Sequence, residues 1–497
     1  MSPSCTLRPL AVIVMTLALG ACTLGPDYQR PQLPEAAAFK QAEGWKLAAP
    51  ADQTLGQAWW RLYGDADLDA LVARLNVSNQ NIAGAEAQYR QARALVRGAR
   101  AGFFPTLSGN VGKTRSGQGT GGSTTTLPDG STVRSSGGGG ISQSYDLNVA
   151  ASWELDIWGR LRRGLESSRA GMQASAADLA AVRLSLQAEL VQNYLQLRVL
   201  DAQKRLLDST VQAYARSLRI TENQYRAGIV GRADTAQART QLKSTEAQAI
   251  DLQYQRAQLE HAIAVLIGVP PAELAIAEHE AIPNLPAVPL VLPSQLLERR
   301  PDVAAAEREV IAANAEIGVA KTAWFPSLSL SAAGGYRSGT LDNWIQTPNR
   351  FWSIGPEFAM TLFDGGLIRS QIEQAEAGYD QTVATYRQTV LDSFREVEDY
   401  LVQLRVLGEE AVVQREALEA AQESQRLVEN QYRAGTVDYL SVVTVQTTAL
   451  TNQRTNLTLL GDRLATSVQL IAALGGGWQV EQLQQEPVLS GERGQDD

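Results

Sequence analysis

Side chains able to do chemistry are scarce in this sequence. Among its 497 residues only two are histidine and two are cysteine. His261 and His279 lie far along the chain from Cys5 and Cys22, so the sequence contains no imidazole–thiolate cluster with metal-ligand spacing. It also contains no nucleophile paired with a base and no glycine-rich phosphate loop. These features argue against an enzyme and against a bound metal or organic cofactor.

Cys22 is the exception, because its position predicts covalent modification of its thiol. Arg8 precedes an apolar stretch, residues 10–19, that is too short for a membrane anchor and is typical of a secretory signal. The sequence LGAC, which ends at Cys22, is similar to the lipobox of bacterial lipoproteins. We expect residues 1–21 to be a signal peptide and Cys22 to carry an N-terminal lipid, with cleavage alone as the alternative. Thr23, rather than aspartate, indicates sorting to an outer membrane.

Charge and apolar segments limit the partners. The net charge of −9 argues against nucleic acid. After the signal, no apolar run is long enough for a transmembrane helix. Cys5 leaves with the signal, so an acylated Cys22 has no cysteine with which to form a disulfide.

One heptapeptide, ENQYRAG, occurs at residues 222–228 and again at 429–435. The same offset of 207 residues relates other identical positions, such as Gly159 and Gly366. Upstream the offset becomes 221, so the first copy holds 14 more residues, which we place in the Gly/Ser/Thr-rich tract 115–144. An offset that stays constant over so long a span indicates two copies of one structural unit.

Each copy contains segments whose alternation predicts β-strands. Apolar and polar residues alternate with period two over 145–157 and again over 352–362. Weaker strands are expected at 105–113 and 326–337, which gives one hairpin per copy. A strand that crosses a bilayer needs about 9–11 residues, and aromatic residues crowd these strand ends as in an interfacial girdle. These features favour membrane strands over the alternative, half of a soluble sheet.

After each hairpin the period becomes that of a long helix. Two apolar heptad registers form a coiled-coil-like seam: Leu179, Leu186, Leu200, Leu207 and Tyr214 in the first, and Leu190, Leu197, Val211, Leu218 and Tyr225 in the second. No proline falls within 160–226, so a continuous helix there would be on the order of 100 Å long. Residues 367–433 should form its counterpart.

Both long helices should end at the duplicated heptapeptide. Gly228 and Gly435 suit the left-handed conformation that ends a helix. The chain would then turn back into return helices at roughly 233–267 and 437–474. The two tips should therefore point the same way.

These patterns divide the chain into six parts. They are a signal peptide (1–21), a lipidated irregular segment (22–60), a first repeat (61–267, with a hairpin at 103–158 and a tip near 226–233), a proline-rich connector (268–301), a second repeat (302–475, with a hairpin at 324–366 and a tip near 433–438) and a polar tail (476–497).

Four membrane strands are too few to close a barrel. Each unpaired backbone group at an open edge in lipid costs several kcal/mol, so other copies of the chain must pair those edges. Eight strands from a dimer would be filled by side chains, whereas twelve from a trimer would leave a lumen. The sequence thus predicts a mixed α and β fold, a trimeric channel-tunnel with a shared β-barrel and a long α-helical barrel.

The chain resembles the TolC-type outer-membrane efflux proteins, in particular their NodT- or OprM-like lipoprotein branch. The motifs that carry the resemblance are, in chain order, Cys22 to Tyr28 with Arg30-Pro31; Trp59-Trp60 with Asp65 and Leu68; Phe104-Pro105; Arg299 to Val303; and Phe325-Pro326. Tyr-Arg-Ala-Gly at both tips completes the set. Together these motifs span nearly the whole chain.

The resemblance implies a homotrimer in the outer membrane of a Gram-negative bacterium, with a large periplasmic portion. It also implies two partners, a periplasmic adaptor protein and an inner-membrane transporter. The adaptor and gate positions carried over by the resemblance are Tyr225, Arg226, Gly228, Val230, Tyr432, Arg433, Gly435 and Val437. The alternative is that the tyrosines and arginines only cap and pack the turns.

Two acidic residues follow the turns. In a trimer, Asp234 and Asp438 would form carboxylate rings that favour cations, or they would be ordinary acids near a helix N-terminus. Many family members carry an aspartate where this chain has Thr444. The sequence therefore does not identify the residues that close the gate.

The predicted function is passive export of small molecules through an outer-membrane duct. An exit duct for secreted polypeptides is the second hypothesis, and a structural lipoprotein without a pore is the third. Neither the exported compound nor the role of 115–144 follows from the sequence.

Overall fold

The computed structural model describes residues 23–33, 39–40, 58–117, 122–128, 130–136, 141–279, 281–286, 299–480 and 483. The predicted signal peptide, Cys22 and most of the predicted tail lie outside the described residues. The chain forms two compact units. The first contains residues up to Arg30, Ala92–Gly171 and Val310–Thr382, and the second contains the remainder.

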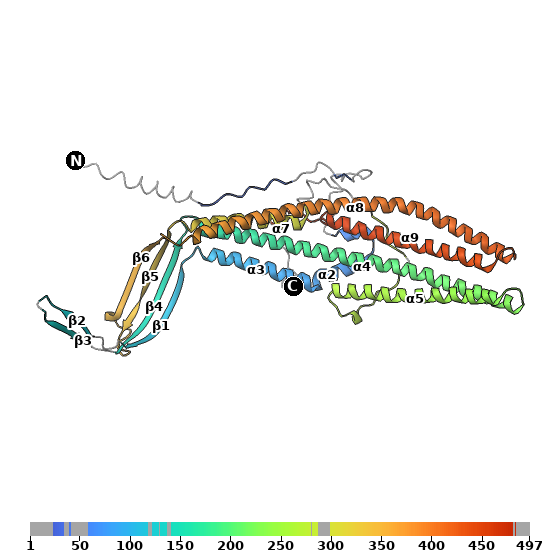
Figure 1. Cartoon of the computed structure of the whole chain (residues 1–497). Helices are drawn as coiled ribbons and strands as arrows, with labels where there is room; N and C mark the ends of the chain where they lie inside the picture. The colour runs from blue at the N-terminus through green and yellow to red at the C-terminus, as the bar shows by residue number, and fades with distance from the viewer. Residues whose placement is uncertain are drawn as a thin grey trace. The chain divides into compact units, whose positions relative to one another are not determined.

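The first unit contains a four-stranded antiparallel sheet (Figure 1). Its strands are β1 (Thr106–Gly117), β4 (Ile141–Leu155), β5 (Ser327–Ser338) and β6 (Arg350–Ala359). Their order is β1-β4-β5-β6, so the hairpins of the two repeats pair through β4 and β5. No described strand pairs with the outer side of β1 or β6. The prediction that each chain contributes four strands to this sheet, one hairpin from each repeat, is confirmed.

The register of the sheet puts apolar side chains on one face. Val111 lies opposite Leu147, Leu147 opposite Tyr336, and Leu328 opposite Phe358. Successive side chains of a strand alternate between faces, so the in-between positions share the other face. That second face carries Asn110, Asn148, Ser152, Asp146, Arg337, Ser331, Ser353 and Glu357.

Within the described residues of the tract 115–144, two further strands occur. Residues Gly122–Thr126 (β2) and Thr132–Ser136 (β3) form a separate two-stranded antiparallel sheet. Gly130 has φ 80° in the connecting turn, a conformation that glycine adopts without steric cost. The sequence analysis did not predict these two strands: Thr and Val have high strand propensity, but the glycine-rich flanks obscured it in the composition.

An extended N-terminal segment, residues 23–30, lies against the rest of the first unit. Arg163, whose side chain is 6% exposed, donates to the Leu24 carbonyl at 3.2 Å and to the Asp27 carboxylate at 2.8 Å. A Cβ on Gly25 would lie 2.5 Å from the Cα of Gly318. Only glycine allows this close approach of the two backbones.

Six helices repeat with the offsets found in the sequence. They are α3 (Gln80–Ala101), α4 (Arg160–Arg226), α5 (Arg232–Leu266), α7 (Pro301–Thr322), α8 (Leu367–Arg433) and α9 (Tyr439–Ala473). The α4 and α8 helices each have 67 residues, α5 and α9 each have 35, and α3 and α7 each have 22. The short elements are η1 (Trp59–Tyr63), α2 (Ala66–Ser78), η2 (Pro271–Glu273) and η3 (Thr347–Asn349). Within the described part of the chain, no helix is both long and apolar enough to span a membrane.

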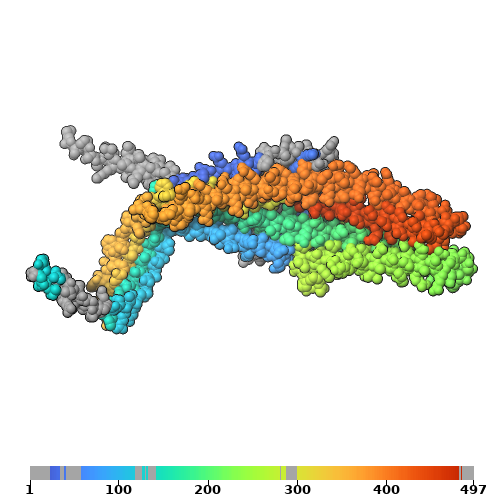
Figure 2. All heavy atoms as spheres, in the orientation of Figure 1, coloured from blue at the N-terminus to red at the C-terminus, as the bar shows by residue number. Residues whose placement is uncertain are grey.

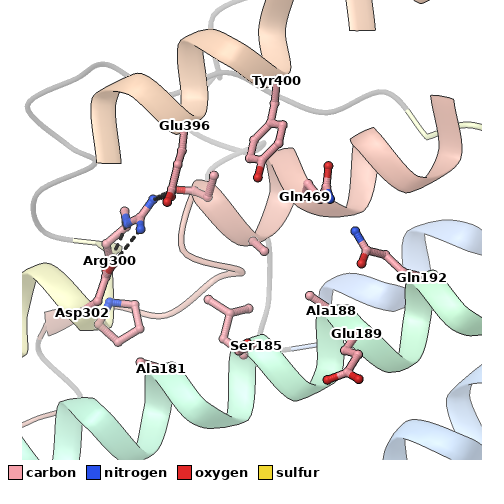
Figure 3. Close-up of a pocket in the computed structure, with 14 residues that line it drawn as sticks. Ala181, Ser185, Ala188, Glu189, Gln192, Arg300, Asp302, Glu396, Tyr400 and Gln469 are labelled. Carbon is pink, nitrogen blue, oxygen red and sulfur yellow. Dashed lines mark hydrogen bonds and ion pairs between the residues drawn. The ribbon is translucent and has the colours of Figure 1, made fainter. Parts of the chain in front are cut away.

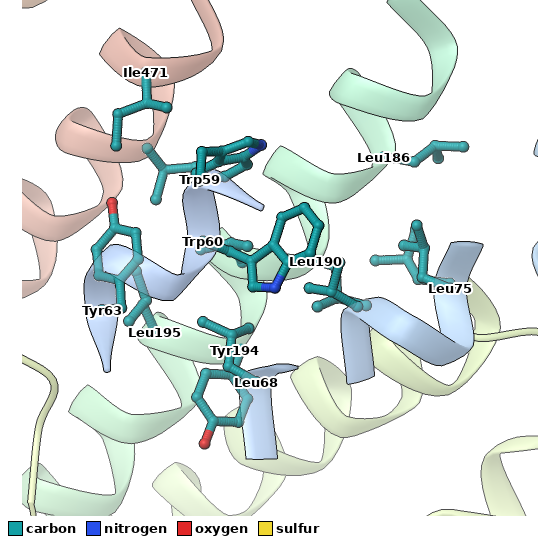
Figure 4. Packing of buried hydrophobic residues seen from close by; sticks show 14 of the residues in the cluster. Trp59, Trp60, Tyr63, Leu68, Leu75, Leu186, Leu190, Tyr194, Leu195 and Ile471 are labelled. Atoms are coloured by element: carbon teal, nitrogen blue, oxygen red, sulfur yellow. The ribbon is translucent and has the colours of Figure 1, made fainter. Parts of the chain in front are cut away.

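The core of the second unit is built around η1 (Figure 4). Trp59 is 1% exposed and packs edge-on against Trp60 at 6.2 Å between ring centroids. The same cluster contains Leu190 of α4 and Ile471 of α9, so it joins the two repeats. The heptad seam is buried here, as its periodicity predicted: Leu179, Leu186, Leu190 and Leu197 are all below 10% exposure.

Candidate functional site: the two helical tips

The two hairpin tips lie at the same end of the second unit, as Figures 1 and 2 show for the ends of α4–α5 and α8–α9. Both long helices end in the same backbone motif. The amide of Ile229 donates to the Gln224 carbonyl at 2.9 Å, and the amide of Thr436 donates to the Gln431 carbonyl at 3.0 Å. Gly228 has φ 74° and Gly435 has φ 76°, which is the left-handed helix end expected at these glycines.

The return helices begin with carboxylates placed differently in the two copies. At the start of α5, the backbone amide of Gly231 donates to the Asp234 carboxylate at 3.0 Å. At the start of α9, Asp438 itself is the N-cap and accepts from the backbone amide of Ser441 at 3.0 Å and from its hydroxyl at 2.6 Å. These hydrogen bonds of Ser441 lower the pKa of Asp438. Both aspartates therefore satisfy helix N-termini within the chain.

The tyrosines of the two tips have different environments. Tyr432 donates its hydroxyl to the side-chain oxygen of Gln224 at 2.8 Å and packs on Tyr439, with 5.6 Å between ring centroids. Burial raises the pKa of both Tyr432 and Tyr439. Tyr225, the counterpart of Tyr432, is 45% exposed. The duplicated sequence thus supplies one packed and one exposed tyrosine.

The other tip residues singled out in the sequence line the outside of the turns. Arg226 and Arg433 are exposed, and Arg226 donates to the Asn223 side chain at 2.5 Å. Val230 and Val437 are half-buried. The structure therefore brings all these residues together at the tips, and their contact with an adaptor stays a prediction.

Two contributors to the tip were missed in the sequence analysis, Gln224 and Tyr439. Gln224 lies inside the duplicated heptapeptide, which was a usable signal, because Tyr432 needs an acceptor when it is half-buried. Tyr439 is 3% exposed, and its hydroxyl lies 3.4 Å from that of Ser217. Only the folded structure, and not the sequence, shows that Tyr439 contributes to the tip.

Thr444 lies on an uncharged face of α9. Its hydroxyl donates to the Leu440 carbonyl at 2.9 Å. A hollow of ≈ 470 Å³ adjoins it, lined by Val443, Thr444, Thr447, Thr448, Thr451 and Asn452. No charged side chain lines this hollow among the described residues, so the two aspartates of the tips remain the candidates for an acidic ring.

Arg300, noted above only as part of a motif, anchors the start of α7 (Figure 3). It pairs with Asp302 at 2.6 Å and with Glu396 of α8 at 2.7 Å, beside a cavity of ≈ 430 Å³. Burial lowers the pKa of Arg300, but the hydrogen bonds and charges of Asp302 and Glu396 outweigh it and raise the pKa overall. Arg300 is therefore a structural cation that ties α7 to α8.

Comparisons with known proteins agree with this architecture. The family described as Outer membrane efflux protein matches residues 71–269 and 292–476. The toluene efflux pump outer membrane protein TtgF of Pseudomonas putida is 32% identical over 476 residues, covering 94% of this chain and 96% of the relative. The cation efflux system protein CusC of Escherichia coli is 30% identical over 483 residues, covering 96% and 100%. A solved structure of the outer-membrane channel OprN superposes with a TM-score of 0.82 at 31% identity, covering 92% of this chain and 100% of that one.

The chain therefore belongs to the outer membrane efflux protein family. It is an efflux channel protein of the Gram-negative outer membrane and not an enzyme. The predictions of family, mixed α and β channel-tunnel fold, function and location are confirmed.

Proposed function

We propose that three copies of this chain form one exit duct, to which a periplasmic adaptor and an inner-membrane transporter deliver small molecules for export. The membrane part is a barrel that the copies share. The helices form the periplasmic part of the passage. Transport through the duct is passive, and the inner-membrane transporter supplies the energy.

The four-stranded sheet is the observation that carries this proposal. Its apolar face suits lipid and its polar face suits a water-filled lumen. Because no described strand pairs with the outer edge of β1 or of β6, an isolated sheet would expose unpaired backbone groups to lipid. Pairing β6 of one copy with β1 of the next removes both edges.

The adaptor contact is assigned to the exposed surface of the tips. It includes Tyr225, Arg226, Gly228 and Arg433, which are exposed, together with Gly435. Val230, Val437 and Asp234 are half-buried behind that surface, and the exposed Asp438 caps α9. The near-identical backbone of the two tips would offer an adaptor two similar docking sites per chain.

We also propose that Cys22 carries the anchoring lipid. The amide of Leu24 donates to the Trp158 carbonyl at 3.2 Å, and Trp158 packs on Phe325 with 4.9 Å between ring centroids. The residues that follow Cys22 therefore lie beside an aromatic cluster of the kind found at membrane interfaces. Metabolic labelling with a palmitate analogue should mark the wild type and a Cys5→Ala control, and should be lost in Cys22→Ala; label retained in that variant would exclude Cys22.

The duct is tested by export and conductance. A Gly435→Trp variant should abolish export, because the indole would obstruct the tip surface, while trimers and membrane insertion remain intact. Unchanged export would refute the assignment of the tip. In planar bilayers, the purified wild type should conduct ions.

The two alternatives make different predictions. A duct for secreted polypeptides would crosslink through its tips to a protein-secretion transporter rather than an efflux transporter. A structural lipoprotein would show no conductance and would become soluble once Cys22 is replaced. The family match to efflux proteins favours the small-molecule duct.

A further inference from the structure

The contact between Tyr432 and Gln224 uses one residue from each copy of the duplicated heptapeptide. Each ENQYRAG copy supplies one glutamine and one tyrosine. The tyrosine of the second copy, Tyr432, donates to the glutamine of the first, Gln224, at 2.8 Å. One tyrosine, Tyr225, and one glutamine, Gln431, are left over.

Both remaining side chains are exposed. Tyr225 is 45% exposed, and Gln431 is also exposed. Tyr225 nevertheless lies on the same heptad register as Leu190 and Leu197, which are both 0% exposed. A seam register predicts a helical neighbour along its whole length, and within the described part of the chain that neighbour is missing at Tyr225.

We propose that Tyr225 of one copy binds Gln431 of the next copy, in the same way that Tyr432 binds Gln224 within the chain. In a closed ring of repeats, each repeat docks on the one before it. The in-chain contact therefore defines the contact between chains after a shift of 207 residues. Contacts within and between chains then alternate around the ring of tips.

One other contact between the two repeats near the tip shifts to an exposed pair in the same way. Tyr439 lies 3.4 Å from Ser217 within the chain. After the shift, this contact becomes Arg232 of one copy beside Ser424 of the next, and both are exposed in the single chain.

A third pair lies further from the tip. Gln241 donates to Thr447 at 3.1 Å, and its shifted counterpart is Thr240 of one copy beside Thr448 of the next. Thr240 and Thr448 are both exposed, and Thr448 lines the ≈ 470 Å³ hollow on α9. An α5 helix from a neighbouring copy would fill that uncharged hollow.

This inference rests on the proposed function, because it assumes a ring of copies. The test therefore distinguishes a failure of this inference from a failure of the proposed function. Full-length Tyr225→Cys and Gln431→Cys chains, each with a different affinity tag, are co-expressed and treated in membranes with a short bismaleimide. We expect a product of two chains that carries both tags, and each variant expressed alone should give none.

The matched control uses the other glutamine and the other tyrosine, which contact each other within one chain. Co-expressed Gln224→Cys and Tyr432→Cys chains should give no product between chains, because that contact lies within one chain. Placed in the same chain, the two cysteines should crosslink without forming a product of two chains. Wild-type protein treated with the same bismaleimide shows whether Cys22 reacts. A Thr240→Cys chain with a Thr448→Cys chain provides a second, independent pair.

The outcomes are distinct. Native mass spectrometry of three chains with neither inter-chain product would overturn the inference and leave the trimer intact. A mass of one chain would overturn both. Equal yields from the Tyr225–Gln431 and Gln224–Tyr432 chain mixtures would also overturn it, because the copies would then contact one another without the proposed register.

Discussion

At the scale of single residues, the tips depend on two glycines with left-handed backbones. Gly228 and Gly435 both have positive φ, and a Cβ on either would meet no atom within 4 Å. Substitution there costs only the backbone strain, about 1–2 kcal/mol. The sequence predicted these turns because glycine is the residue that the motif requires.

A Gly435→Ala variant should therefore fray the second tip. Trypsin should cut after Arg433 roughly tenfold faster, since about 1.4 kcal/mol corresponds to a factor of ten. Gly408→Ala is the matched control, because Gly408 lies within α8 with equally open surroundings and alanine favours a helix. Equal cleavage of the two variants would contradict the role of the backbone conformation.

The N-cap at Asp438 should make the second tip sensitive to acid. Its pKa is lowered in the folded protein by the hydroxyl and amide of Ser441. The stabilisation is thus fully present above the ordinary value of 3.8 and is lost as the pH falls through the lowered pKa. Hydrogen exchange of residues 439–442 should accelerate there relative to an Asp438→Asn variant, whose amide caps without titrating. A constant ratio between the two proteins from about pH 6 to about pH 3 would contradict this.

At the scale of elements, two helices related by the repeat place equivalent arginines in different environments. Arg198 of α4 is 1% exposed and binds Asp201 at 3.2 Å and the Ala277 carbonyl at 2.7 Å. Its counterpart Arg405 in α8 has a side chain 41% exposed and pairs with Glu409. The five residues QLRVL around both arginines are identical, but Asp201, the partner of Arg198, is replaced by Gly408 in the second copy. The connector after α5 also packs on Arg198 of the first copy, through the Ala277 carbonyl.

Arg198→Ala should therefore destabilise the chain far more than Arg405→Ala. Removing one partner of a buried ion pair costs about 3–5 kcal/mol, whereas an exposed pair contributes at most about 1 kcal/mol. The midpoint of helix unfolding, followed by circular dichroism, should fall clearly in the first variant only. A similar loss in both would mean that the connector adds little.

The sequence predicted the strands better than it predicted which elements pack against the helices. Period-two alternation identified the faces of β4 and β6, and the register of all four strands agrees with it. The β2–β3 hairpin was not predicted, because glycine-rich flanks dominated the composition of that tract. Pairing between β4 and β5 depends on contacts far apart in the sequence, which periodicity does not encode.

Adjacent residues of β6 test the two faces directly. Ile354 lies opposite Ala332 on the apolar face, and Ser353 lies opposite Ala333 on the other. A lysine on a lipid-facing position near the bilayer midplane costs about 2–4 kcal/mol. Ile354→Lys should reduce the outer-membrane fraction of the protein, and Ser353→Lys should leave it near the wild-type level. The reverse order would mean that the lumen and lipid faces are exchanged.

At the scale of the whole molecule, the duplication explains why one chain is not enough. The in-chain contacts between repeats leave unmatched groups at both ends: the outer edges of β1 and β6, and Tyr225 with Gln431 at the tips, among the residues that the structure describes. A linear pair of repeats always leaves two such ends. A ring of copies would satisfy both through contacts that the repeat relates to those that already join the two halves of the chain.

The mass of the folded protein in a bilayer tests this account most directly. Native mass spectrometry from lipid nanodiscs should give three times the mass of the mature chain, with no stable species of one chain. Detection of a single, folded and membrane-inserted chain would contradict the shared barrel and the ring of tips together.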